Sequence, residues 1–271
     1  SMTHNANLDM MISTQATAFG FGNPSEKVAE FERFLQAFQV WIQSSEQAVL
    51  GLPKKRTPHV VSGITDAFNQ LYGMYNKIGV HDGEYMYHQN VLKEERITTN
   101  LEEADCIVIS HPFSADGQCS HDRIKEADKL GIPIFIDCAF FGICHGIDFN
   151  FKPYNNIHSV CFSLSKTFGT GLNRVGLLYT KDNFPCKVYK EWGYPLIASA
   201  EHHYRKIKEI GPDDLPKKYL QRQIRVCRKL GLIPSPTVIF GLSYDPRYTR
   251  FKRGSTNRVC ITRRLEYYDE Q

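Results

Sequence analysis

Short apolar runs alternate with helical patterns through the middle of the chain. Runs at 59–61, 104–110, 132–136 and 159–162 are rich in valine, isoleucine or phenylalanine and have the length of buried strands. Between the second and third runs, residues 120–130 have the pattern of a helix. Such alternation predicts an α/β fold, with a mostly parallel sheet and helices on both of its faces.

The two ends of the chain have patterns of their own. After a polar arm, apolar residues recur at helical spacing from position 28 to position 42, so a helix is expected there. Two strand patterns, 237–243 and 256–262, lie toward the C-terminal end, after two further helical stretches. We therefore expect an N-terminal arm and helix (1–52), a large domain (53–195) and a reduced small C-terminal α+β domain (196–271).

Four polar residues of the large domain each lie just past a predicted strand. They are Thr65, Ser114, Asp137 and Ser163. Ligands of parallel α/β sheets bind beyond the carboxyl ends of the strands, so we expect these four side chains to surround one site. Asp137 is the most informative of them, because a carboxylate at the end of an apolar strand is costly unless it meets a cation. The simpler alternative is that Asp137 caps a helix.

Segment 163–176, Ser-Leu-Ser-Lys-Thr-Phe-Gly-Thr-Gly-Leu-Asn-Arg-Val-Gly, combines hydroxyls, an amine and a guanidinium. Side chains alternate along a strand, so Ser163 and Ser165 share one face, with Lys166 just beyond them. The glycines allow a sharp turn, after which Arg174 returns on the next strand. The pattern predicts a phosphate pocket with an amine beside it. The alternative is an ordinary strand, turn and strand.

This segment resembles the Schiff-base segment of the aspartate aminotransferase superfamily, the fold-type I enzymes that use pyridoxal phosphate. The family motif is Ser-x-Ser-Lys-x-x-Gly followed by Arg-x-Gly, and the chain matches it at Ser163, Ser165, Lys166, Gly169, Arg174 and Gly176. The resemblance covers residues 55–180 well and implies a shortened member. It implies that Lys166 binds pyridoxal phosphate as a Schiff base. Asp137 would then pair with the pyridine nitrogen, which keeps the ring an electron sink.

The resemblance also implies contacts elsewhere in the large domain. The cofactor phosphate would be bound by Gly63, Ile64, Thr65, Ser163, Ser165 and Arg174. For the first three, which open a predicted helix, an ordinary helix cap is the alternative. Tyr85 matches an aromatic residue that stacks on the cofactor ring, and Tyr87 is the second choice.

Two positions depart from the family pattern. Where the family has an asparagine and a tyrosine that donate to the cofactor's ring oxygen, this chain has Ser114 and Phe140. Serine is shorter and phenylalanine has no hydroxyl, so the type of reaction stays open. Toward the C-terminal end, Arg258 matches the family's arginine for the substrate carboxylate, and its guanidinium suits that group. A solvated basic face is the alternative there.

These residues and the resemblance predict an enzyme that acts on an amino acid, with an aminotransferase as the first choice. An aminotransferase would also take a 2-oxo acid. A decarboxylase, lyase or oxidase of an amino acid is the alternative, and a non-catalytic relative of the family is a further one. Family members build each site at a dimer interface, so the resemblance implies a homodimer.

Composition sets limits on partners and location. A net charge of +4 over 271 residues gives no reason to expect nucleic acid or a membrane as a partner. None of the eight cysteines forms a Cys-x-x-Cys pair, so we expect a reducing compartment, no disulfides and no metal site. The sequence has neither a signal-peptide pattern nor a membrane-spanning run, which predicts a cytoplasmic protein.

Overall fold

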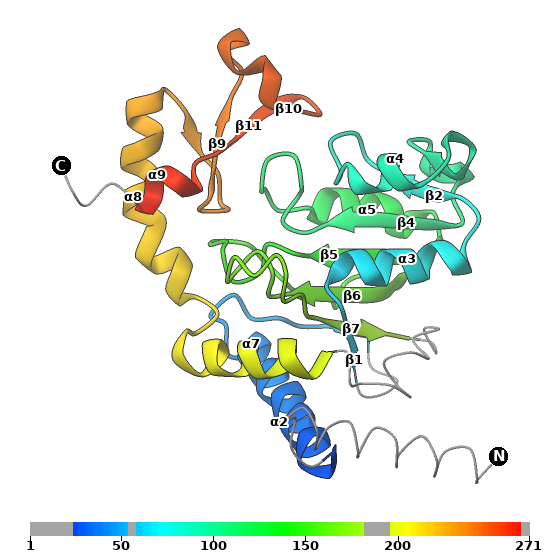
Figure 1. Cartoon of the computed structure of the whole chain (residues 1–271). Coiled ribbons are helices and arrows are strands. Elements are labelled where there is room, and N and C mark those ends of the chain that lie inside the picture. Colours follow the sequence, from blue (N-terminus) through cyan, green and yellow to red (C-terminus); the bar gives the residue numbers. More distant parts are fainter. Residues whose placement is uncertain (1–23, 54–57, 182–195, 267–271) are drawn as a thin grey trace.

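Two sheets of different size form the framework of the protein (Figure 1). The computed structural model describes residues 24–53, 58–181 and 196–266. The larger sheet has seven strands, and the smaller one has four. The strands of the larger sheet, in spatial order, are β1 (His59–Val61), β7 (Gly176–Thr180), β6 (Ile157–Ser163), β5 (Ile134–Cys138), β4 (Cys106–Ser110), β2 (Ile78–Val80) and β3 (Ile97–Thr98).

The large sheet is parallel apart from one strand. β6, β5, β4, β2 and β3 pair in parallel with their neighbours. β7 is antiparallel to both β6 and β1, so β1 again runs in the direction of the parallel strands. The predicted mostly parallel sheet is therefore confirmed, and β1, β4, β5 and β6 all end at the same edge.

Helices cover both faces of this sheet because its central strands are apolar on both faces. In β5, Ile134 and Ile136 belong to the core on one face and Phe135 to the core on the other. This is the alternation that a strand buried on two sides requires. The first core lies against α2 (Pro24–Gln43), α5 (His121–Lys129) and α7 (Ile197–Glu209), and the second against α3 (Ile64–Met74). Short helical turns lie between β2 and β4: α4 (Tyr87–Val91), η1 (Glu94–Arg96) and η2 (Leu101–Glu103).

The smaller sheet is antiparallel and lies beside a long helix, α8 (Asp214–Leu230). Its strands, in spatial order, are β10 (Lys252–Arg253), β11 (Thr256–Cys260), β9 (Phe240–Ser243) and β8 (Ile233–Pro234). Gly231 ends α8 in a left-handed conformation, as its position in the sequence suggests. The 3-10 turn η4 (Pro246–Phe251) and the helix α9 (Thr262–Glu266) complete this part.

Direct backbone contacts join the two sheets. Val238 N donates to Ile143 O at 2.9 Å, next to a β-bridge between Cys144 and Thr237. Ser235 Oγ donates to Asp116 O at 2.7 Å. These contacts hold the small sheet over the loops that follow β4 and β5. Within the described residues, no helix has the length and apolar character needed to cross a bilayer.

Gly51 lies where the chain approaches residues 149–152 too closely for a side chain. Leu50 N donates to Phe149 O, and Phe151 N donates to Leu50 O at 2.8 Å. Gly51 has a φ of +74°, and a Cβ added there would lie 2.3 Å from the backbone nitrogen of Lys152. Gly131 has a similar φ of +71°, but an added Cβ there meets no atom within 4 Å.

We therefore expect Gly131→Ala to lower the free energy of unfolding by about 1 kcal/mol, the cost of the backbone conformation alone. Gly51→Ala should cost about 3 kcal/mol, because overpacking against backbone atoms adds to that cost. Urea unfolding of the two variants and the wild type measures both values. Equal decreases in the free energy of unfolding of the two variants would show that the backbone of residues 149–152 leaves room for a side chain at position 51.

Candidate active site

A cavity of about 210 Å³ lies past the carboxyl ends of β1, β4, β5 and β6, under the small sheet. Most of the site residues predicted from the sequence line it: Ile64, Thr65, Tyr85, Ser114, Asp137, Phe140, Ser163, Ser165, Lys166, Arg174 and Arg258. Gly63, the second-choice Tyr87 and the motif glycines Gly169 and Gly176 do not. Ile64 and Thr65 begin α3, which follows β1, and Tyr85 follows β2. The others from the large sheet lie at the ends of β4, β5 and β6 or in the segments that follow them. Arg258 alone comes from the small sheet, on β11.

One end of the cavity is suited to an anion. The N-terminus of α3 points there, and the first-turn N–H groups of a helix have no intrahelical partners. Arg174 Nη2 donates to Thr65 Oγ1 at 2.7 Å, which brings a guanidinium to the helix start. Gly63 has a φ of +76°, and a Cβ added there would lie 3.0 Å from Arg174 Nε. A glycine is thus required both by the backbone and by the close guanidinium.

Two buried polar atoms at this end have no hydrogen-bond partner among the described residues, Ser165 Oγ and Arg174 Nε. Ser163 lies beside them at the end of β6, and its Oγ accepts from Ser165 N at 3.2 Å. Buried donors are rarely left unpaired, so these atoms indicate a bound group with acceptor oxygens. We call Thr65, Ser163, Ser165 and Arg174, with the start of α3, the anion cradle. A phosphate fits its donors and its positive charge.

Asp137 lines the same cavity at the end of β5, with only 4% of its surface exposed. Its Oδ1 accepts from Ala139 N at 2.8 Å. Burial raises the pKa of this carboxyl to about 6, although the Ala139 hydrogen bond and the charge of Lys166 act in the opposite direction. A cation bound next to Asp137 would offset the free-energy cost of burying its ionised carboxylate.

The amine of Lys166 lies between two aromatic rings. Its Nζ is 6.0 Å from the ring centre of Tyr85 and 5.8 Å from that of Phe140. The side chain keeps solvent contact along the open cavity, but the surrounding protein still desolvates the amine. Burial, followed by the charge of Arg258, lowers the pKa of Lys166, and Asp137 partly offsets this. A lowered pKa leaves more of the amine neutral and nucleophilic.

Of the two candidate tyrosines, Tyr85 lines the cavity. Tyr87 stacks on the outer side of Tyr85, with ring centres 5.9 Å apart, and its hydroxyl donates to Asn69. Phe140 packs edge-on against Phe240 of the small sheet at 5.3 Å. Its ring therefore closes the cavity on the side where a hydroxyl would be expected from the family pattern.

Arg258 and Ser114 are joined across the two sheets. Arg258 Nη1 donates to the carbonyl oxygen of Ser114, and the guanidinium lies 4.4 Å above the ring of Phe240. Burial, with the nearby charge of Arg253, lowers the pKa of Arg258 to about 10, so the group remains a cation at neutral pH. The basic residue is thus part of the cavity wall rather than a solvated surface.

Sequence reasoning missed several groups around the cavity: Phe68, Ser110, Ala139 and Gly171, which line it, and Glu84, which lies behind Ser110. Glu84 is 5% exposed. It accepts from Ser110 N at 2.6 Å, from Ser110 Oγ at 2.7 Å and from Tyr85 N at 3.1 Å. Ser110 is 26 positions away in the sequence, so no local pattern could have revealed this pairing.

Solved structures of two aminotransferases and a decarboxylase share the fold. A histidinol-phosphate aminotransferase from Clostridium acetobutylicum has 17% identity and a TM-score of 0.58, over 88% of this chain and 86% of that one. A PLP-bound protein from Clostridium difficile 630, described as an aminotransferase, has 10% identity and a TM-score of 0.62, over 87% and 80%. An L-threonine-O-3-phosphate decarboxylase from Porphyromonas gingivalis has 13% identity and a TM-score of 0.57, over 89% and 89%.

No protein-family model and no curated protein sequence matches the chain. At these identities the structural likeness establishes the fold, which is that of the fold-type I aminotransferases, as the resemblance in segment 163–176 predicted.

Glu84 should make the stability of the protein without cofactor depend on pH. Burial raises the pKa of Glu84 from 4.5 to about 7, against the opposing Ser110 hydrogen bonds, so the folded protein binds more protons than the unfolded chain between those values. The free energy of unfolding should therefore fall as pH rises from about 4.5 to about 7, by up to roughly 3 kcal/mol.

In Glu84→Gln this part of the pH dependence should disappear, while the smaller part due to Asp137 remains. Glu102→Gln, at an exposed position, serves as the matched control and should keep the wild-type slope. Urea unfolding at a series of pH values measures the slopes. A Glu84→Gln slope equal to that of the wild type would contradict the raised pKa.

Proposed function

We propose that this protein, which has the fold of aminotransferases, binds pyridoxal phosphate on Lys166 and acts on an amino acid, as an aminotransferase in the first instance. The main support for the proposal is the following observation. A buried carboxylate, Asp137, and a desolvated amine, Lys166, lie past the ends of adjacent strands, in one cavity with the anion cradle. The cofactor offers a pyridine nitrogen, an aldehyde and a phosphate, which these three features suit respectively.

In this proposal the anion cradle holds the cofactor phosphate. Ser165 Oγ and Arg174 Nε, which lack partners among the described residues, gain phosphate oxygens as acceptors. Thr65 and Ser163 add hydroxyls, and the turn Gly63-Ile64 adds the positive end of α3. Tyr85 contributes a flat aromatic face to the cavity, against which a flat ring can stack.

When bound, pyridoxal phosphate supplies an electron sink that stabilises negative charge at the substrate Cα. Asp137 holds the proton on the pyridine nitrogen, because a carboxylate buried this deeply is stabilised by a protonated partner. Lys166 would hold the cofactor through its aldehyde carbon, and its amine would be the base that moves a proton from the substrate Cα. Its lowered pKa suits both roles.

Arg258 binds the substrate carboxylate, since it is a partly buried cation that lines the same cavity. The substrates are then an amino acid and, for transamination, a 2-oxo acid. We further propose a homodimer, on the ground of the resemblance stated above. Each subunit holds its own Lys166 and Asp137.

A decarboxylase or lyase is the second candidate, and a specific feature favours it. Ser114 and Phe140 take the places of the two usual donors to the cofactor's ring oxygen, and Phe140 packs into the small sheet instead of offering a hydroxyl. Transamination consumes a 2-oxo acid in proportion to the amino acid, and decarboxylation does not. Product analysis with and without 2-oxoglutarate therefore distinguishes the two.

Treatment with pyridoxal phosphate followed by borohydride should attach the cofactor permanently to a single lysine, Lys166. Lys166→Arg should lose this labelling, and Lys217→Arg, which changes an exposed lysine paired with Glu46, should keep it. Peptide mass spectrometry identifies the labelled residue. Equal labelling of many surface lysines in both variants would show that Lys166 has no special affinity for the aldehyde.

Arg258→Gln should raise KM for the reactive amino acid by roughly 10- to 100-fold, because a charge-assisted contact with the carboxylate is lost, while kcat changes less. Arg253→Gln provides the control, since Arg253 is a nearby arginine of β10 that does not contribute to the cavity wall. Steady-state kinetics of both variants gives the comparison. An unchanged KM in Arg258→Gln would show that Arg258 does not bind the substrate carboxylate.

A further inference from the structure

A second group of chemically active side chains lies outside the cavity, on the loop between β4 and α5. His111 follows the end of β4, and Cys119 and His121 lie on either side of Ser120 at the start of α5. One ring nitrogen from each histidine and the sulfur of Cys119 lie within 4.8 Å of one another. This spacing suits three ligands of one metal ion.

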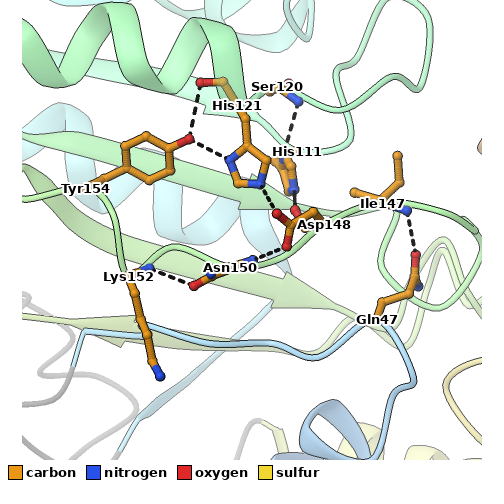
Figure 2. A network of polar contacts seen from close by, with 9 residues as sticks. All are labelled: Gln47, His111, Ser120, His121, Ile147, Asp148, Asn150, Lys152 and Tyr154. Carbon is orange, nitrogen blue, oxygen red and sulfur yellow. Dashed lines mark hydrogen bonds and ion pairs between the residues drawn. The ribbon is translucent and has the colours of Figure 1, made fainter.

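The hydrogen bonds of His111 fix which of its nitrogens carries the proton (Figure 2). Ser120 N donates to Nδ1 at 3.2 Å, so Nδ1 is unprotonated. Nε2 lies 2.7 Å from the carbonyl oxygen of Asp148, which can only accept, so Nε2 is the donor. The ring is completely buried and packs edge-on against Phe149 and Phe151. Its orientation is therefore fixed, with a lone pair on Nδ1.

His121 also lies against Asp148. Its Nε2 is 3.2 Å from Asp148 Oδ2, an ion-pair distance, but the contact lacks the geometry of a hydrogen bond. Its Nδ1 is hydrogen-bonded to the hydroxyl of Tyr154 at 2.8 Å, and in the tautomer with the proton on Nε2 this nitrogen is the acceptor. Asp148 is itself held in place, since its Oδ1 accepts from Asn150 N at 2.9 Å (Figure 2).

His111 has the outer hydrogen bond that metal-binding histidines usually have, and an ion at Nδ1 of each histidine would replace the present hydrogen bonds with Ser120 N and Tyr154. A ligating histidine usually donates its other N–H to a carboxylate or a backbone carbonyl, which sets the tautomer and the ring orientation. Here the carbonyl oxygen of Asp148 accepts from His111, and its carboxylate lies 3.2 Å from Nε2 of His121. Imidazole nitrogen with a thiolate is the ligand set that zinc prefers. Cys119 is exposed, so an ion can reach the site.

We propose that His111, Cys119 and His121 bind a zinc ion, with Asp148 as the positioning residue for both histidines. This differs from the expectation of no metal site, which was based on the lack of a Cys-x-x-Cys pair. The inference does not depend on the proposed function. A bound ion would link the two ends of the loop 111–121 and stabilise its contacts with the segment 148–154. This loop includes Ser114 of the cavity wall.

Zinc titration of the tag-free full chain tests the proposal, after removal of metals by a chelator and with a chromophoric chelator as competitor. We expect one zinc ion per chain. Cys119→Ser and His121→Gln should weaken binding by more than about 100-fold, and Asp148→Ala by about 10- to 100-fold. Cys260→Ser changes another exposed cysteine and should bind zinc as the wild type does.

Two further readouts separate ligation from a general effect on folding. Cadmium should produce a thiolate charge-transfer band in the wild type and in Cys260→Ser but not in Cys119→Ser. Zinc at about a hundred times Kd should raise the unfolding midpoint by roughly 5 °C in the first two proteins only. Lack of zinc binding by the wild type, or equal binding by Cys119→Ser, would overturn the proposal. Neither result would affect labelling of Lys166, so the two proposals fail separately.

Discussion

The carboxylate of Asp137, buried at the end of an apolar strand, is the constraint on which the rest of the site depends. Burial raises its pKa to about 6, so its charged form is costly in the protein alone. The amine of Lys166, the guanidinium of Arg174 and the guanidinium of Arg258 all face the same small cavity. A ligand that carries both a positive nitrogen and an anionic group would offset the cost of burying Asp137 and would also balance these cations.

The topology of the large sheet brings these groups together. β7 is the antiparallel strand of this sheet. It lies between β1 and β6 and is antiparallel to both, so β1 and β6 run in the same direction. The segments that follow β1, β4, β5 and β6 therefore meet at a single edge of the sheet, and α3 begins in the first of them. The small sheet closes this edge from above, through the backbone contacts between Val238 and Ile143 and the bond from Arg258 to Ser114.

Much of the large sheet and of the cavity wall could be predicted from the sequence, because the patterns that indicate them lie within short segments. The strands β4 and β5 are mostly apolar and β6 has the apolar run 160–162, while segment 163–176 has its polar side chains at a fixed spacing. β2, with three residues that include Gly79, was missed because it is too short and too weak a pattern. Glu84 and Asp148 were missed for another reason: each acts on residues 26 or more positions away, so only the folded chain shows their partners.

The protonation state of the pyridine nitrogen is the most direct test of the central claim. Nitrogen-15 NMR of labelled pyridoxal phosphate bound to the protein at neutral pH reports it without any knowledge of the substrate. The Asp137–Lys166 arrangement predicts a protonated nitrogen in the wild type and an unprotonated one in Asp137→Asn. An unprotonated nitrogen in the wild type, the same signal in both proteins, or no binding at all would contradict the account.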